Sequence, residues 1–191
     1  MRRIIDLNIE YTNLQREKSN IPGGNIEIET FEEFYLNEIL SFAKENNYSN
    51  YELVQTIGKL KTENKSEWIN EYLFIRLIWK VGLKNDPKNR ELLEKLIRSL
   101  LVKDDMNNAE EYYLESYLDI WNSDLEVLIP IDILESIILM NHQKSVVRYG
   151  AFIKAVSYLS DHPESIKDDI LNKARQTKRY SEDEYYKEWI D

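Results

Sequence analysis

Histidine is the side chain best suited to proton transfer at neutral pH, and this chain has two, His142 and His162. Neither belongs to a His-Glu-x-x-His or Glu-x-x-His pattern, so no helix offers paired metal ligands. His162 has acids nearby, but Pro163 follows it, which indicates the entry to a helix. The chain has no cysteine, and its five glycines form no phosphate-binding loop. We therefore expect no catalytic residue, metal or cofactor, and a protein that is not an enzyme.

Carboxylates are the residues that do cluster. The whole chain has 35 acids and 25 bases, a formal net charge of −10, yet no lysine or arginine occurs from Asp104 to Gln143. Within this stretch Glu111, Glu115 and Asp119 are spaced to share one helical face, where like charges repel by about 0.2–0.5 kcal/mol per pair. Aromatic residues are interleaved with the acids: Tyr112, Tyr113, Tyr117 and Trp121.

A concentrated acidic surface with aromatic anchors fits docking onto a basic protein. We predict that the following residues bind a partner: Asp104, Asp105, Glu110, Glu111, Tyr112, Glu115, Asp119, Asp124 and Glu126. The alternative is a solvated acidic face with its aromatic residues in the core. Direct binding of nucleic acid is disfavoured by charge repulsion. The one basic cluster is followed at once by acids, which indicates a self-neutralised helix end; it consists of Lys173, Arg175, Lys178 and Arg179.

Helical periodicity begins at Thr30 and continues to the end of the chain. Capping boxes are expected at Thr30, Ser49 and Ser181, each followed three residues later by glutamate, and Asp86-Pro87 and His162-Pro163 mark further starts. About nine helices joined by short connections predict an all-α array of antiparallel helix hairpins. Their expected ranges are 30–47, 49–63, 66–82, 87–101, 107–122, 131–141, 144–160, 163–177 and 181–189.

Residues 1–29 show a different pattern. Apolar residues alternate with polar ones from Ile5 to Tyr11 and again from Ile26 to Glu29, and Pro22-Gly23-Gly24 supplies a turn. This predicts a small β-hairpin or extended arm over 1–29, followed by one helical-repeat domain over 30–191.

The segment 141–163 places Gly150 and Ala151 inside the expected helix 144–160, where small residues allow a neighbouring helix to approach closely. This segment, with Val147-Arg148 followed by Ala151 and Ala155, resembles a HEAT repeat, and residues 78–93 match more weakly around Asp86-Pro87. The resemblance implies an irregular α-solenoid, because helix 107–122 separates the two matching units; a compact helical bundle is the alternative.

In size, acidity, lack of cysteine and helical-repeat character, the chain resembles the all-helical immunity proteins of bacterial polymorphic toxin systems. The resemblance implies an inhibitor that docks on a basic toxin, often a nuclease, and blocks its active site. Two alternatives stay open: a phage-type acidic inhibitor or nucleic-acid mimic that acts on another nucleic-acid enzyme, and a helical-repeat scaffold or regulator. With no signal peptide and no apolar run of about 18 residues, we expect a cytoplasmic protein without membrane contact.

Overall fold

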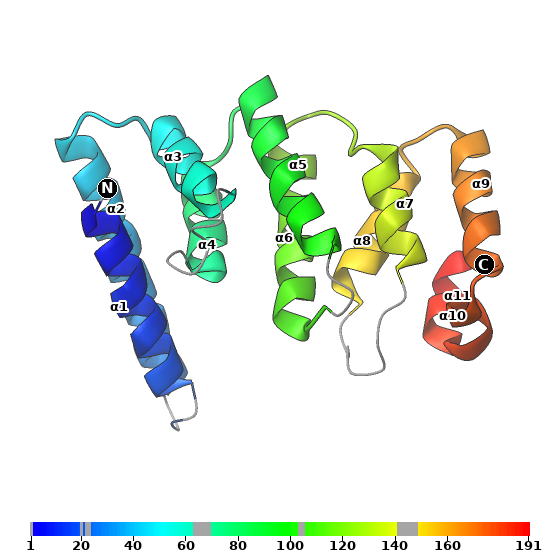
Figure 1. Cartoon of the computed structure of the whole chain (residues 1–191), viewed down its shortest axis with the longest axis horizontal. Helices are drawn as coiled ribbons and strands as arrows, with labels where there is room; N and C mark the ends of the chain where they lie inside the picture. Colours follow the sequence, from blue (N-terminus) through cyan, green and yellow to red (C-terminus); the bar gives the residue numbers. More distant parts are fainter. Residues whose placement is uncertain (1, 20, 22–23, 63–69, 103–105, 141–148) are drawn as a thin grey trace. The chain divides into compact units, whose positions relative to one another are not determined.

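A computed structural model describes residues 2–19, 21, 24–62, 70–102, 106–140 and 149–191, and every regular element among them is a helix (Figure 1). The all-α prediction is therefore confirmed for this part of the chain. The chain divides into two compact units, Met1–Lys84 and Asn85–Asp191. The division falls inside the range 30–191 that we expected to be one domain. Each unit is described by itself.

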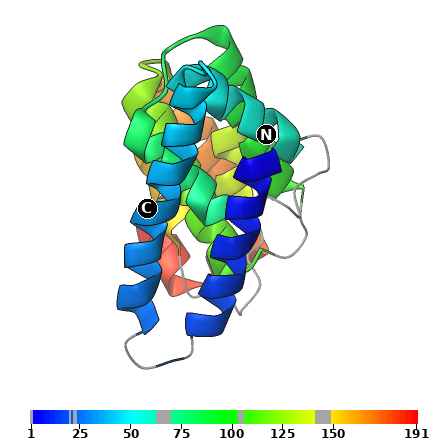
Figure 2. The ribbon, with the colours of Figure 1, turned by 90° about the vertical axis from the view of Figure 1, so that its left-hand side faces the viewer.

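Unit 1 consists of α1 (Arg2–Lys18), α2 (Gly24–Glu45), α3 (Asn50–Thr62) and α4 (Glu71–Val81). The first two helices lie side by side (Figure 2) and form the largest helix contact of the unit. The predicted capping box of α3 is confirmed, because Ser49 Oγ accepts a hydrogen bond from the Glu52 amide and the Ser49 amide donates to Glu52 Oε2.

The predicted β-hairpin or arm over 1–29 is wrong, because both of its segments are helical. Burial along this segment follows the period of a helix and not that of a strand. The buried residues are Leu7, Asn8 and Tyr11, whereas Ile9 is 40% exposed. Alternation over a few residues also contains i, i+4 pairs such as Leu7 and Tyr11, and packing against α2 selects between the two readings. The capping box predicted at Thr30 is wrong for the same reason, since Thr30 lies within α2.

Polar contacts join the helices of unit 1. Asn70 caps α4 by accepting from the Leu73 amide at 3.0 Å, while its side-chain amide donates to Gln15 and Thr12 of α1 at 3.0 and 3.3 Å. Ion pairs connect helices that are distant in sequence, namely Arg3–Glu38, Lys61–Glu71, Arg76–Glu32 and Lys80–Glu33. Four acids of unit 1, Glu32, Glu33, Glu38 and Glu71, thus have bases of the same unit beside them.

Unit 2 contains α5 (Pro87–Leu101), α6 (Asn108–Asp124), α7 (Ile131–Leu139), α8 (Gly150–Leu159), α9 (Glu164–Arg175), α10 (Lys178–Glu182) and α11 (Glu184–Ile190). Asp86 caps α5 by accepting from the amides of Lys88 and Asn89, as the Asp-Pro signal predicts. The capping box predicted at Ser181 is wrong: Ser181 lies within α10, and Asp183 caps α11. Helix α6 packs against both α5 and α8, and α8 also packs against α7.

Gly150 is the first residue of α8, although the sequence predicted a helix over 144–160; residues 144–148 lie outside the described part of the chain. The expected close approach at Gly150 and Ala151 is confirmed. Ala151 is fully buried, and a Cβ added at Gly150 would overlap the carboxylate of Glu115 from α6. The group that approaches Gly150 is therefore the Glu115 carboxylate of α6, which lies at the beginning of α8.

Candidate partner-binding site

The acidic row of α6 lies against α8. Glu111 is 0% exposed, and its Oε1 accepts a hydrogen bond from the Ala151 amide at 2.9 Å. One turn later Glu115 lies beside Gly150. A further turn on, Asp119 Oδ1 accepts from the Tyr158 hydroxyl at 2.6 Å and pairs with Lys154 at 2.9 Å.

The stretch from Asp104 to Gln143 offers this row no base, but Lys154 of α8, which the spacing on α6 could not reveal, pairs with Asp119. Glu111 cannot contact a partner protein in this conformation, since its side chain is buried. Two of the three acids stand at the first turn of α8, where the unpaired amides of a helix favour negative charge.

Burial raises the pKa of two groups at this contact, Glu111 on α6 and Tyr158 on α8. Desolvation raises the pKa of the Glu111 carboxyl; the amides of Ala151 and Phe152 oppose the shift, and Arg179 opposes it more weakly. Desolvation also raises the pKa of the Tyr158 hydroxyl, and its hydrogen bond to Asp119 adds to the effect. Both groups are held by contacts within unit 2, which indicates a structural role for the row.

Arg179 forms a second polar cluster inside unit 2. The residue is 7% exposed, and its guanidinium carbon lies 4.2, 4.9 and 5.3 Å from the ring centroids of Tyr186, Phe152 and Tyr149. Its Nε donates to Asp183 Oδ2 at 3.4 Å, and Nη1 donates to the carbonyl oxygen of Met140 at 3.0 Å. Desolvation lowers the pKa of this guanidinium, while Asp183 and the tyrosines raise it.

Sequence reasoning missed this cluster because it assigned Arg179 to a basic helix end. The members of that basic cluster do each pair with a carboxylate, so its self-neutralisation is confirmed. The pairs are Lys173 with Asp169 and Glu135, Arg175 with Asp191, Lys178 with Glu182, and Arg179 with Asp183. No local signal distinguished the buried arginine, because its three rings come from other turns and helices.

The remaining predicted residues do not join the acidic row. Glu110 closes the capping box at the start of α6, where its Oε2 accepts from the Asn107 amide at 2.9 Å, and Tyr112 is half-buried. Asp124 ends α6, and Glu126 is exposed beyond it with φ of 52°. The two ends of this helix are roughly 25 Å apart at 1.5 Å per residue. Asp104 and Asp105 lie outside the described residues.

The net charge is divided unequally between the units. Residues 1–84 contain 13 acids and 11 bases, a charge of −2, whereas residues 85–191 contain 22 acids and 14 bases, a charge of −8. Some exposed acids of unit 2 form no ion pair with any described residue; they are Glu126, Asp161, Asp168, Glu184 and Glu188. These carboxylates are exposed, whereas Glu111 on α6 is buried and Asp119 is partly covered by Tyr158 and Lys154.

The outward face of α11 combines such acids with aromatic rings. Tyr186 and Ile190 point inward and are buried, whereas Tyr185 and Trp189 are 42% and 39% exposed. The Tyr185 ring touches that of Tyr149, with centroids 4.9 Å apart. Sequence reasoning did not select this helix, although the signal is present: the pair Glu184 and Glu188 and the pair Tyr185 and Trp189 each have i, i+4 spacing.

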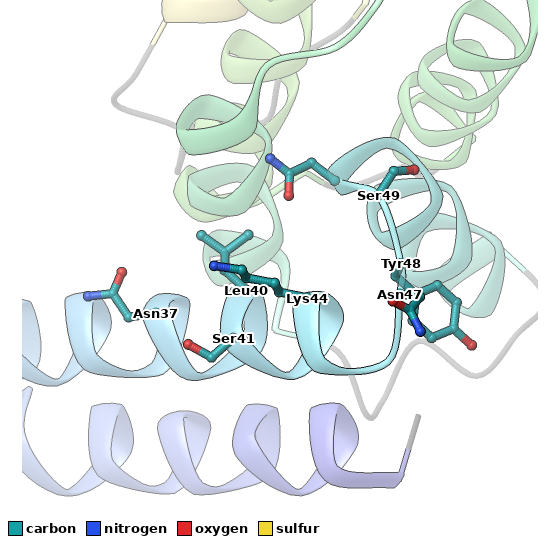
Figure 3. A pocket seen from close by; sticks show the side chains of 8 residues that line it. Asn37, Leu40, Ser41, Lys44, Asn47, Tyr48 and Ser49 are labelled. Atoms are coloured by element: carbon teal, nitrogen blue, oxygen red, sulfur yellow. The ribbon is translucent and has the colours of Figure 1, made fainter.

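Unit 1 has an open polar hollow of about 690 Å³ where α2 turns into α3 (Figure 3). It is lined by Asn37, Leu40, Ser41, Lys44, Asn47, Tyr48, Ser49 and Asn50. The lining offers amides, hydroxyls and one cation, but no carboxylate or imidazole. It can exchange hydrogen bonds with solvent or a polar molecule, and Lys44 and Tyr48 are the titratable groups of its lining.

Comparisons with known proteins returned no matching family model, no matching curated protein and no matching solved structure. Among the described residues, no group of three or more histidine, cysteine, aspartate or glutamate side chains is placed to hold a metal ion. None of the described helices has both the length and the apolar composition required to span a bilayer.

Proposed function

We propose that this chain is a protein-binding inhibitor that docks on a basic partner. In its most specific form the proposal is an immunity protein that neutralises a toxin, such as a nuclease, by covering the active site. The observation that supports it is the charge of −8 on residues 85–191, with several exposed acids that form no ion pair with described residues. In this proposal the helix hairpins continue as an irregular solenoid, whose length provides the docking surface.

Charge of this kind acts mainly on the encounter between two proteins. An acidic surface attracts a basic partner and raises the association rate, while it repels nucleic acid. Glu111, Asp119 and Arg179 each contact other groups of unit 2, namely the Ala151 amide, the Tyr158 hydroxyl and the Met140 carbonyl. Because these groups serve the fold, the exposed carboxylates are the ones left for recognition, and binding is favoured over catalysis.

The experiment that tests this proposal is affinity capture with the tagged chain from its source cells, at about 0.15 M salt and again at several-fold higher salt. We expect a basic partner, identified by mass spectrometry, whose capture falls as the salt concentration rises. The purified partner should then lose its activity in the presence of an equimolar amount of the chain. A partner that is acidic, or that stays fully active in the complex, would contradict the proposal.

The identity of the partner also separates the alternatives. A toxin domain encoded next to this chain supports the immunity form of the proposal. An enzyme of DNA or RNA metabolism that the chain inhibits supports the phage-type inhibitor. A partner that remains active when bound supports a scaffold.

A further inference from the structure

We infer that the outward face of α11 (Glu184, Tyr185, Glu188 and Trp189) binds an arginine-bearing segment of a basic partner. In this arrangement a guanidinium lies on the exposed aromatic rings and pairs with a carboxylate. The inference rests on the proposed function only for the claim that the partner is basic. It adds which surface makes the contact and which side chain of the partner the surface recognises.

This face has exposed aromatic residues, which are typical of the centre of a protein interface, and charged residues beside them. Tyr185 and Trp189 expose 42% and 39% of their surface, one helical turn apart. Glu184 and Glu188 are exposed beside them at the same spacing, and neither forms an ion pair with a described residue. Although Tyr185 contacts Tyr149, the Tyr185 and Trp189 rings keep a large exposed surface on the outer side of this seven-residue helix, and a partner is what would cover it.

On the inner side of α11, aromatic rings and a carboxylate already bind an arginine, Arg179. There the Arg179 guanidinium lies 4.2 Å from the Tyr186 centroid and 5.3 Å from the Tyr149 centroid, and Nε donates to Asp183. Tyr149 also contacts Tyr185, so the inner and outer aromatic groups are continuous. The outer face repeats the combination of rings and carboxylates, and a guanidinium from another protein would complete it.

The exposed aromatic pair on α2 lacks this combination. Phe31 and Phe34 on α2 are 40% and 50% exposed, but the adjacent Glu32 and Glu33 are paired with Arg76 and Lys80. On α11 the carboxylates are uncommitted, and the whole of unit 2 carries a charge of −8. Arginine suits the site better than lysine, because a planar guanidinium stacks on a ring and can pair with a carboxylate at the same time.

The test uses the full chain and a synthetic peptide of alternating arginine and glycine, with lysine and glutamate peptides of the same length. Binding is followed by the NMR signal of the Trp189 indole N–H, which the Trp189→Phe variant assigns. We expect the arginine peptide to shift this signal, the lysine peptide to bind more weakly and the glutamate peptide to have no effect.

Variants of this face then show which of its side chains contribute to binding of the arginine peptide. Glu184→Gln with Glu188→Gln, and separately Tyr185→Ala, should each raise the dissociation constant of the arginine peptide by about three- to ten-fold. Asp161→Asn with Asp168→Asn is the control, because it removes the same charge at exposed positions away from α11. Thermal unfolding confirms that each variant is folded. Equal weakening by the control, or peptide binding that leaves Trp189 unchanged, overturns the inference.

The two proposals fail in different ways. If the Glu184 and Glu188 variant captures the basic partner as well as the parent does, the inference about α11 is wrong and the proposed function stands. If the chain captures no basic partner, yet Trp189 responds to the arginine peptide, the proposed function is wrong and the arginine-binding face stands.

Discussion

Two helices of unit 2 carry the same motif and use it in opposite ways. In both α6 and α11, glutamates at i, i+4 are interleaved with aromatic residues. Helix α6 packs on α5 and on α8, so its acids are enclosed: Glu111 is 0% exposed and Asp119 pairs with Lys154. The outer side of α11 is open, and Glu184 and Glu188 face solvent. Spacing tells which acids share a face of a helix; the neighbours of the helix decide where that face points.

The strongest test of this contrast reverses the charge of the inner acids. Glu111→Lys, Glu115→Lys and Asp119→Lys together should strongly destabilise unit 2, because Glu111→Lys buries an unpaired cation near Arg179 and Asp119→Lys removes the partner of Lys154. An unpaired charge left in the interior typically costs several kcal/mol. The sequence alone had suggested that relief of repulsion along α6 would leave the variant at least as stable as the parent. Circular dichroism during heating distinguishes the two outcomes.

The matched control for this variant reverses three outer acids, Glu126→Lys, Glu184→Lys and Glu188→Lys. Each residue is exposed and forms no ion pair with the described part of the chain, so the unfolding free energy should change by about 0.5 kcal/mol or less. If the inner and outer variants unfold at the same temperature, α6 and α11 do not differ as the structure indicates.

Substitution of Arg179 should have the next largest effect. Arg179→Ala removes a cation from three rings and deletes the hydrogen bond to the Met140 carbonyl, and it should cost about 2–4 kcal/mol. Arg179→Lys keeps the charge but not the planar group, and should fall between alanine and the parent. Urea unfolding monitored by tyrosine and tryptophan fluorescence measures both. A lysine variant as stable as the parent would show that charge alone matters there.

The helices were predictable where their starts have local chemistry. Asp86-Pro87 and Ser49 with Glu52 act through hydrogen bonds within a few residues, so helices α5 and α3 lie where the sequence places them. Residues 5–11 were misassigned because a short run satisfies both periods, and only contact with α2 decides between them. Gly150 begins α8 instead of lying inside it, and its neighbour Glu115 comes from a helix distant in the sequence, which no local pattern reveals.

The candidate site was harder to predict, because a site depends on which surfaces remain open. The acids of α6 were correctly placed on one face, but Lys154, Tyr158 and Arg179 reach that region only after α8 and α10 have packed. In contrast, the outer face of α11 could have been recognised from the sequence. Tyr185 and Trp189 have i, i+4 spacing, and the acids Glu184 and Glu188 beside them have the same spacing. What the sequence lacked was the evidence that Tyr186 and Ile190 are the buried side.

The pH dependence of Glu111→Gln tests the burial of the inner row with a smaller change. Burial raises the folded-state pKa of Glu111, so its contribution to stability is present at low pH and is lost as pH rises through that pKa. Glutamine stays neutral and can still accept the hydrogen bond from the Ala151 amide. Relative to the parent, the variant should therefore gain stability as pH rises above the ordinary glutamate pKa of about 4.3. A constant difference over this rise in pH would mean that Glu111 is as well solvated as in the unfolded chain.

The smallest effect is expected at Gly150, where two opposing terms nearly cancel. Alanine favours the helix by up to about 1 kcal/mol over glycine, and less at a first helical position. Its Cβ would overlap the Glu115 carboxylate, but that group is the flexible end of a side chain and can rotate away. Gly150→Ala alone should therefore change the unfolding free energy by no more than about 0.5 kcal/mol. In a Glu115→Ala background the overlap is absent, and the same substitution should be stabilising. Denaturant unfolding of the four proteins in this double-mutant cycle should give a coupling free energy of about 0.5–1 kcal/mol, whereas additive effects would place Glu115 away from the beginning of α8 and weaken the contrast with the open face of α11.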